Sequence, residues 1–225
     1  MSQPVGDHPE PGGQLLRAVE VMDRLRSPGG CPWDAEQTHA SLAPYLIEEA
    51  YETLDAIETA DLAALREELG DLLLQVLFHA RLAEEAHPEQ RFGIDDVAAD
   101  LVAKLIRRHP HVFARTEPDA QDFSAGDQQL SWDAIKKVEK RRESVTDGIA
   151  LGQPALALAA KLVSRSSRAG LAVELPAGEG IGDRLLAIAA EAVHAGLDPE
   201  QALRQSAREY REAIRAAEPG HTSGE

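Results

Sequence analysis

The sequence is poor in cysteine, in aromatic residues and in positive charge. Its 225 residues include one cysteine, Cys31, so neither an intramolecular disulfide nor a Cys-x-x-Cys zinc site can form. Lysine and arginine number 23 against 39 aspartate and glutamate residues, the net charge is -16, and aromatic residues make up 4%. Because affinity for a phosphate backbone comes from clustered basic residues, this composition argues against a general nucleic-acid-binding protein.

Long apolar runs are also missing. The first residues lack the charged and apolar regions of a secretory signal, and no apolar stretch approaches membrane-spanning length. With the single cysteine, these absences predict a soluble protein of the reducing cytoplasm, with neither a membrane nor a nucleic acid as partner.

The hydrophobic pattern has a helical period along most of the chain, and no alternating pattern typical of strands is convincing. The predicted fold class is therefore all-α. Asp61 is a predicted N-cap for a helix at 62–85, and Asp95 for a helix that ends before Pro110. Helical stripes are also predicted at 15–25, 47–57, 131–143, 183–195 and 199–217.

Composition divides the chain into five parts. Residues 1–13, rich in proline and glycine, are a predicted disordered leader, and 218–225 a flexible tail. Between them we predict a helical domain at 14–143, a linker at 144–153 and a smaller helical unit at 154–217.

Acidic residues recur at helical spacing in the stretches LIEEAYETLDAI and LREELGDLLLQV. Glu49 with Glu52, and Glu68 with Asp71, are three residues apart, so each pair shares a helix face. A short connection makes the two helices antiparallel neighbours, and the pairs can converge. Converging carboxylates repel one another unless a cation lies among them, and oxygen ligands favour Mg²⁺ or Mn²⁺.

A solvated helix surface is the alternative interpretation. Glu49 and Glu52 lie opposite the apolar stripe of Ile47 and Leu54, where charged residues commonly face water. Asp71 favours a site, because it directly precedes the nearly all-apolar stretch 72–78, which we expect to be buried. A di-iron carboxylate bundle would need Glu-x-x-His on two helices, and that motif is missing.

Basic and aromatic residues supply candidate partners for a polyphosphate and a base. In KLIRRHPHVF, Lys104 and Arg108 share a helix face beside Arg107, which suits a polyphosphate, although basic residues also complement a helix C-terminus. Trp132 lies four residues before a lysine in SWDAIKKVEK. Trp33, in a turn, could stack on a base, although core packing explains either tryptophan equally well.

These motifs resemble the MazG-type nucleoside triphosphate pyrophosphohydrolases of the all-α NTP pyrophosphatase superfamily. The family signature EExxE, a spacer and ExxD is met by Glu48, Glu49, Glu52, Glu68 and Asp71. The similarity extends over about 15–142, through MDRLRSPGGCPWDAEQTHASL, KLIRRHPHVF and WDAIKKVEK. It implies an antiparallel helical bundle that assembles as a homodimer or higher oligomer, in which another subunit could cover the exposed face of the acidic 47–57 helix.

The resemblance also implies an activity and a site. Family members hydrolyse nucleoside triphosphates between the α- and β-phosphates with Mg²⁺, giving the monophosphate and pyrophosphate. By position, Glu49, Glu52, Glu68 and Asp71 would bind the metal, and Glu48 would support the site or position the water. The implied substrate-binding residues are Trp33, Asp34 and Gln37 at the nucleoside, Lys104, Arg107 and Arg108 at the phosphates, and Trp132 and Lys136 at the pocket edge.

The second half resembles a degenerate second copy of the same helical unit. Gly180 stands where the glutamate of ExxD is expected, although Asp183 is retained, and Glu209 and Ala213 stand where a lysine and an arginine are expected. We therefore predict that 154–217 is catalytically inactive and has a structural or dimerising role.

The sequence thus predicts a Mg²⁺-dependent nucleoside triphosphate pyrophosphohydrolase that cleans the nucleotide pool. A narrower enzyme for pyrimidine deoxynucleotides such as dUTP or dCTP is one alternative. A non-catalytic acidic helical protein that binds a partner through its charged face is the other.

Overall fold

The computed structural model describes residues 12–113 and 143–218, and the regular structure within these ranges is entirely helical. The predicted all-α fold is confirmed. Most of the predicted leader and tail and nearly all of the predicted helix at 131–143 lie outside the described residues. The chain divides into two compact units, 1–122 and 123–225, which are described separately; the predicted domain boundaries stay predictions.

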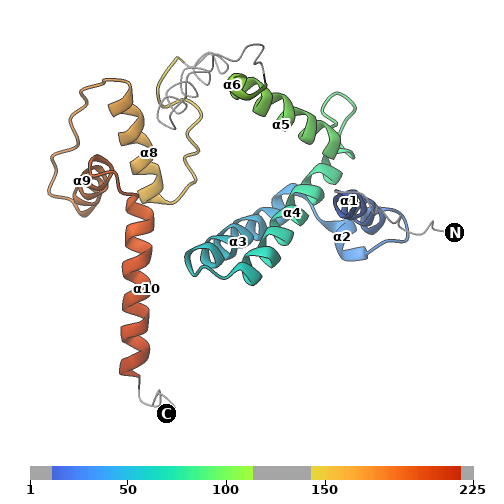
Figure 1. Cartoon of the computed structure of the whole chain (residues 1–225), viewed down its shortest axis with the longest axis horizontal. Coiled ribbons are helices and arrows are strands. Elements are labelled where there is room, and N and C mark those ends of the chain that lie inside the picture. Colours follow the sequence, from blue (N-terminus) through green and yellow to red (C-terminus); the bar gives the residue numbers. More distant parts are fainter. Residues whose placement is uncertain (1–11, 114–142, 219–225) are drawn as a thin grey trace. The chain divides into compact units, whose positions relative to one another are not determined.

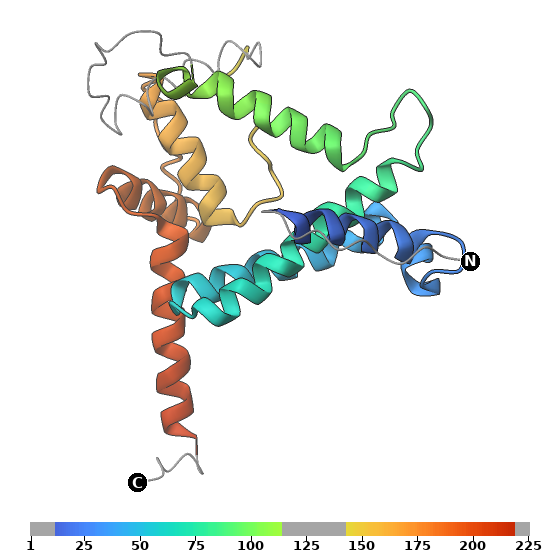
Figure 2. The same cartoon turned by 45° about the vertical axis from the view of Figure 1, so that its right-hand side comes forward.

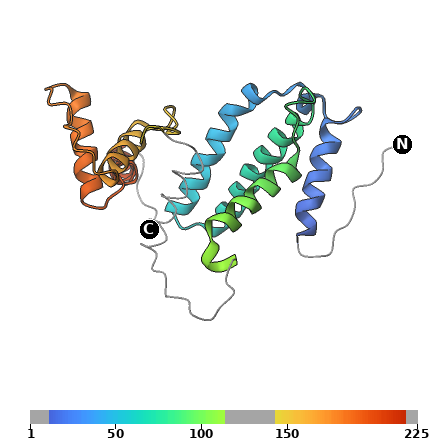
Figure 3. The same ribbon diagram turned by 90° about the horizontal axis from the view of Figure 1, so that it is seen from above.

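The first unit is built on a pair of antiparallel helices. In chain order, its described helices are α1 (Gly13–Arg26), α2 (Pro32–Glu36), α3 (His39–Glu58), α4 (Leu62–Ala83), α5 (Ile94–Arg108) and α6 (Pro110–Phe113). Helices α3 and α4 lie side by side, and α1 packs against α4 (Figures 1 and 3). Beyond the connection at 84–93, α5 diverges from α4 (Figures 1 and 2).

Local signals define the ends of the two central helices. The side chain of Asp61 accepts hydrogen bonds from the backbone N–H groups of Ala63 and Ala64, so the predicted N-cap of α4 is confirmed. Helix α3 begins at His39, earlier than predicted, because Thr38 and Ser41 form a reciprocal capping box.

The predicted N-cap of α5 is wrong, because the N-cap is Gly93, two residues before Asp95. The Asp96 carboxylate, rather than that of Asp95, accepts a hydrogen bond of 2.8 Å from the backbone N–H of Gly93 before the helix. Asp95 lies in the first turn, where its negative charge complements the helix N-terminus.

The core of this unit is formed by α1, α3 and α4. Its buried residues are Met22, Leu42, Leu77 and Phe78. Helix α4 is central, as predicted, but it is not buried all round, because Leu74 and Val76 are exposed. The apolar stretch 72–78 is therefore exposed at these two positions within the described part of the unit.

The second unit contains α8 (Ala155–Arg168), α9 (Ile181–His194) and α10 (Pro199–Ala217) in its described part. Helices α8 and α9 pack together, and α10 contacts both and extends beyond them (Figures 1 and 2). Asp198 caps α10 by accepting from the N–H groups of Glu200 and Gln201. Across the described residues of both units, each helix is too short or too polar to cross a bilayer.

Candidate metal and nucleotide site

Three carboxylates converge between α3 and α4. Glu49 of α3 faces Glu68 and Asp71 of α4, and one carboxylate oxygen from each lies within 4.8 Å of the others. All three side chains are half-buried. The tight turn capped by Asp61 fixes the antiparallel register that brings them together.

Burial, and then mutual repulsion, raise the pKa values of two of these carboxylates. The pKa of Glu49 lies above its ordinary value, first because of burial and then because of the negative charges of Asp71 and Glu52. The pKa of Glu68 is raised by burial, then by Glu52 and Asp71. Such a group of oxygen ligands, charged and held close together, fits a hard divalent cation.

The structure therefore brings together three of the four predicted metal ligands. Glu52 is exposed and lies outside the group within 4.8 Å, but its charge raises the pKa of both glutamates. Glu48 is exposed, and its charge makes the smallest of the contributions that raise the pKa of Glu49.

The faces of α3 differ at two positions from those expected for a solvated acidic surface. Ile47 is 58% exposed, whereas Glu49 is half-buried against α4. The buried positions of α3 are Leu42, Thr53 and Ala56. Periodicity misassigned the faces because two of these three residues are small or polar.

Two buried polar residues near the acidic cluster, Thr53 and Gln75, were not predicted from the sequence. Thr53 lies one turn after Glu49, and Gln75 one turn after Asp71; they are 7% and 4% exposed. Among the described residues, neither the Thr53 hydroxyl nor the Gln75 side-chain oxygen has a hydrogen-bond partner. Asp71, Gln75 and His79 are spaced four residues apart and so share one face of α4, and this spacing could have predicted the buried position of Gln75.

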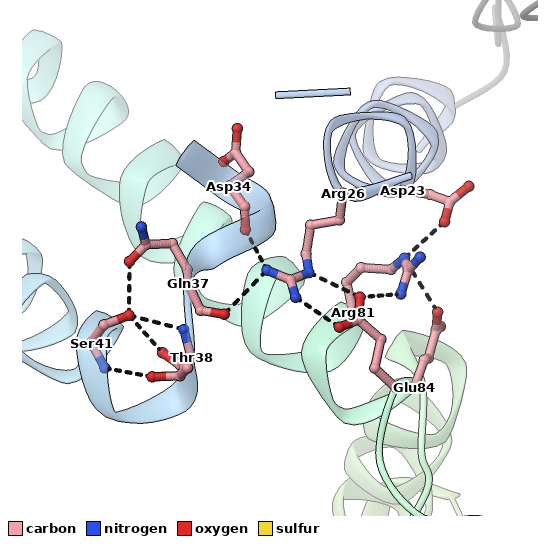
Figure 4. A network of polar contacts seen from close by, with 9 residues as sticks. Asp23, Arg26, Asp34, Gln37, Thr38, Ser41, Arg81 and Glu84 are labelled. Atoms are coloured by element: carbon pink, nitrogen blue, oxygen red, sulfur yellow. Dashed lines mark hydrogen bonds and ion pairs between the residues drawn. The ribbon is translucent and has the colours of Figure 1, made fainter. Parts of the chain in front are cut away.

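An aromatic group lies on the other side of the core. The Trp33 ring meets those of Tyr45 and Phe78 edge to face, with centroids 6.2 and 6.5 Å apart, yet it is 52% exposed. Gln37 donates from Nε2 to the carbonyl of Trp33 at 3.0 Å. Its Oε1 accepts from the Ser41 hydroxyl at 2.7 Å (Figure 4). Trp33 is thus held by contacts with α3 and α4 while about half of it stays exposed.

The remaining predicted residues are spread over other parts of the chain. Lys104 and Arg107 are exposed on α5, and Arg108 is half-buried. Trp132 and Lys136 lie outside the described residues. The phosphate-binding role of the three basic residues stays a prediction.

Comparison with known proteins gives a consistent family. Residues 37–113, which contain the acidic cluster, match the model of the MazG nucleotide pyrophosphohydrolase domain. The chain is 38% identical to the nucleoside triphosphate pyrophosphohydrolase/pyrophosphatase MazG of Thermotoga maritima, over 93% of this chain and 87% of that protein. It is 54% identical to an uncharacterized 26.1 kDa protein of Streptomyces cacaoi, over 95% and 86%.

One similar protein is longer than this chain and aligns with most of it. The nucleoside triphosphate pyrophosphohydrolase of Mycobacterium tuberculosis is 46% identical over 92% of this chain. The chain spans 59% of the length of that relative.

Proposed function

Because the chain belongs to the MazG nucleotide pyrophosphohydrolase family, as its sequence predicted, we propose that it hydrolyses nucleoside or deoxynucleoside triphosphates to the monophosphate and pyrophosphate, cleaning the nucleotide pool of the cytoplasm. One observation carries the proposal: the half-buried cluster of Glu49, Glu68 and Asp71 lies within the matched residues. A cluster of carboxylates held close together supplies the oxygen ligands that a metal-dependent phosphoryl site needs.

Mg²⁺ is the proposed cofactor, and Mn²⁺ can replace it. Glu49, Glu68 and Asp71 would hold the ion with the help of Glu52, and all of these donors are carboxylate oxygens. When bound, such an ion neutralises triphosphate charge and lowers the pKa of a water molecule.

The chain's own residues would bind the substrate and accept a proton. The oxygen of a water molecule forms a bond to one phosphorus of the anhydride between the α- and β-phosphates, and a carboxylate accepts a proton of that water. The bond from the same phosphorus to the bridging oxygen breaks, and the bridging oxygen leaves with the other product. We place Glu48 beside this water. Trp33, Asp34 and Gln37 would border the nucleoside, whereas Lys104, Arg107 and Arg108 would bind the phosphates, and Trp132 and Lys136 would form the pocket edge.

A homodimer or higher oligomer is part of the proposal. Several large apolar side chains on α3 and α4 are exposed in the single chain, among them Tyr51 and Leu74. Leu62, Leu69 and Val76 recur every seven residues along α4, so they share one face of that helix, and all three are exposed. A second copy that covered this face would remove a large apolar surface from water. The inactive 154–217 unit would assist this assembly.

Product chromatography after incubation with nucleotides and Mg²⁺ tests the activity, with Glu68→Ala as control. Monophosphate and pyrophosphate, absent with the variant, are the expected result. Diphosphate and phosphate would mean that another bond is cleaved. Turnover confined to dUTP or dCTP would indicate a narrow pyrimidine enzyme, and no turnover at all would leave a non-catalytic acidic interaction protein.

A further inference from the structure

Helix α2 carries two of the residues proposed to border the nucleoside, but it has little to hold it in place. It is five residues long, and none of its residues is buried. Helices much shorter than about 12 residues are not stable on their own. The position of Trp33 and Asp34 must therefore be set by contacts from neighbouring elements.

Arg26, the last residue of α1, makes the most extensive of these contacts. Its side chain is 5% exposed, and its Nη1 donates to the backbone carbonyls of Asp34 and, at 3.3 Å, of Gln37 (Figure 4). Its Nε and Nη2 donate to the two carboxylate oxygens of Glu85 at 3.0 and 2.7 Å. One guanidinium thus joins α1 and α2 to the residues that follow α4.

The same guanidinium lies against the aromatic group. The central carbon of the Arg26 guanidinium is 5.7 Å from the centroid of the Phe78 ring, and Phe78 also meets Trp33 edge to face. Phe78 is therefore in contact with both the residue that holds α2 and the aromatic residue that α2 presents. A lysine could not reproduce this set of contacts, because an ammonium group lacks the planar fork of donors.

We propose that Arg26 is a positioning residue for the nucleoside end of the substrate site: it fixes Trp33, Asp34 and Gln37 relative to α4 without touching the substrate itself. This inference rests on the proposed function. The acidic cluster depends on the packing of α3 against α4 rather than on α2. Loss of Arg26 therefore weakens nucleotide binding more than it slows the chemical step.

The matched control is Arg81, a second arginine of the same network. Arg81 pairs with Asp23 at 2.8 Å, with Glu84 at 3.7 Å and with Glu85 at 3.0 Å. These ion pairs join α1 to the end of α4, and none of those described for Arg81 reaches α2 (Figure 4). Arg81→Met therefore removes ion pairs from the network but leaves the hydrogen bonds from Arg26 to α2 in place.

Steady-state kinetics with Mg²⁺ and a panel of nucleotides give the first test. Because hydrogen bonds from a charged group are lost, we expect Arg26→Met to raise KM about tenfold and to change kcat less than about threefold. Arg26→Lys, which keeps the charge, should fold and still show most of the rise in KM, whereas Arg81→Met should leave KM unchanged. Equal KM values for the two methionine variants, or a loss confined to kcat, would overturn the inference.

A fluorescence measurement tests the placement of α2 without substrate. In a Trp132→Phe background, Trp33 is the sole tryptophan, because the chain has two. Arg26→Met should make Trp33 more accessible to acrylamide, and Arg81→Met should not. Unchanged quenching with Arg26→Met would overturn the positioning role even if the wild-type protein is active. Absence of nucleotide hydrolysis by the wild-type protein would instead overturn the proposed function and with it the role at a substrate site, whereas the quenching would still decide whether Arg26 positions α2.

Discussion

His39 and His79 form a stacked pair between the start of α3 and the second half of α4. Their Nδ1 atoms lie 2.7 Å apart, and the two rings are parallel within 1°, with centroids 5.0 Å apart. One ring must donate and the other accept, so the pair requires that at least one ring be neutral. Burial, and then the nearby His39, hold the pKa of His79 below its usual value.

Stability is therefore expected to fall as the pH drops below about 6.5, the ordinary pKa of histidine. The unfolded chain binds a proton at His79 more readily than the folded chain does, so the free energy of unfolding decreases until the pH passes below the lowered pKa. Urea unfolding of the wild-type protein and of His79→Phe, between pH 5 and 7.5, measures this effect. Phenylalanine cannot titrate at this position, so a slope as steep in the variant as in the wild type would contradict the assignment to His79.

Replacement of one carboxylate of the acidic cluster should separate stability from activity. Without a metal, the ionised Glu68 side chain destabilises the folded state at neutral pH, as its raised pKa indicates. Protonation of Glu68 as the pH falls toward 4.5 would therefore stabilise the folded protein. Glu68→Gln should therefore raise Tm in EDTA. Because it removes a proposed metal ligand, it should lower kcat/KM roughly a hundredfold or more.

Glu67→Gln is the matched control for this prediction. Glu67 is an exposed neighbour, and its charge makes only a small contribution to the raised pKa of Glu68. This variant should keep its activity. If Glu68→Gln were as active as Glu67→Gln, the cluster would be a surface feature rather than a site.

Divalent metal should stabilise the folded protein. A ligand that binds the folded state alone adds about 2.7 kcal/mol at a concentration of 100 Kd, so Mg²⁺ should raise Tm in a concentration-dependent way. The effect should be largely lost in Asp71→Asn and should weaken as the pH falls, because protons compete for Glu49 and Glu68. Calorimetric scans with Mg²⁺, with potassium chloride of equal ionic strength as control, distinguish metal binding from charge screening.

Local sequence signals predicted the parts of the fold that local chemistry determines. Asp61 begins α4 as expected, and the predicted range 199–217 matches α10 because a capping aspartate and a proline mark its start. The convergence of Glu49 with Glu68 and Asp71 followed from two helices with acidic residues at suitable spacing and a short connection.

Features that depend on distant partners were not predicted. Arg26 and Glu85 are 59 residues apart, and His39 and His79 are 40 apart, so no local pattern relates them. The buried face of α3 was assigned wrongly, because its inner positions include Thr53 and Ala56 while Ile47 faces outward. A hydrophobic stripe predicts burial only when every partner that covers it belongs to the same chain.

The exposed apolar face of α4, formed by Leu62, Leu69 and Val76, leads to a prediction about assembly. Leu69 is 51% exposed in the single chain, so a charged residue there should cost an isolated subunit little, roughly 0.5 kcal/mol or less. In a dimer that buries this face, the same charge would be desolvated without a partner. Leu69→Glu should therefore shift the protein toward monomers in sedimentation-velocity experiments, whereas Leu151→Glu, at an exposed apolar position before α8, should not. An unchanged sedimentation coefficient for Leu69→Glu would mean that another surface joins the subunits.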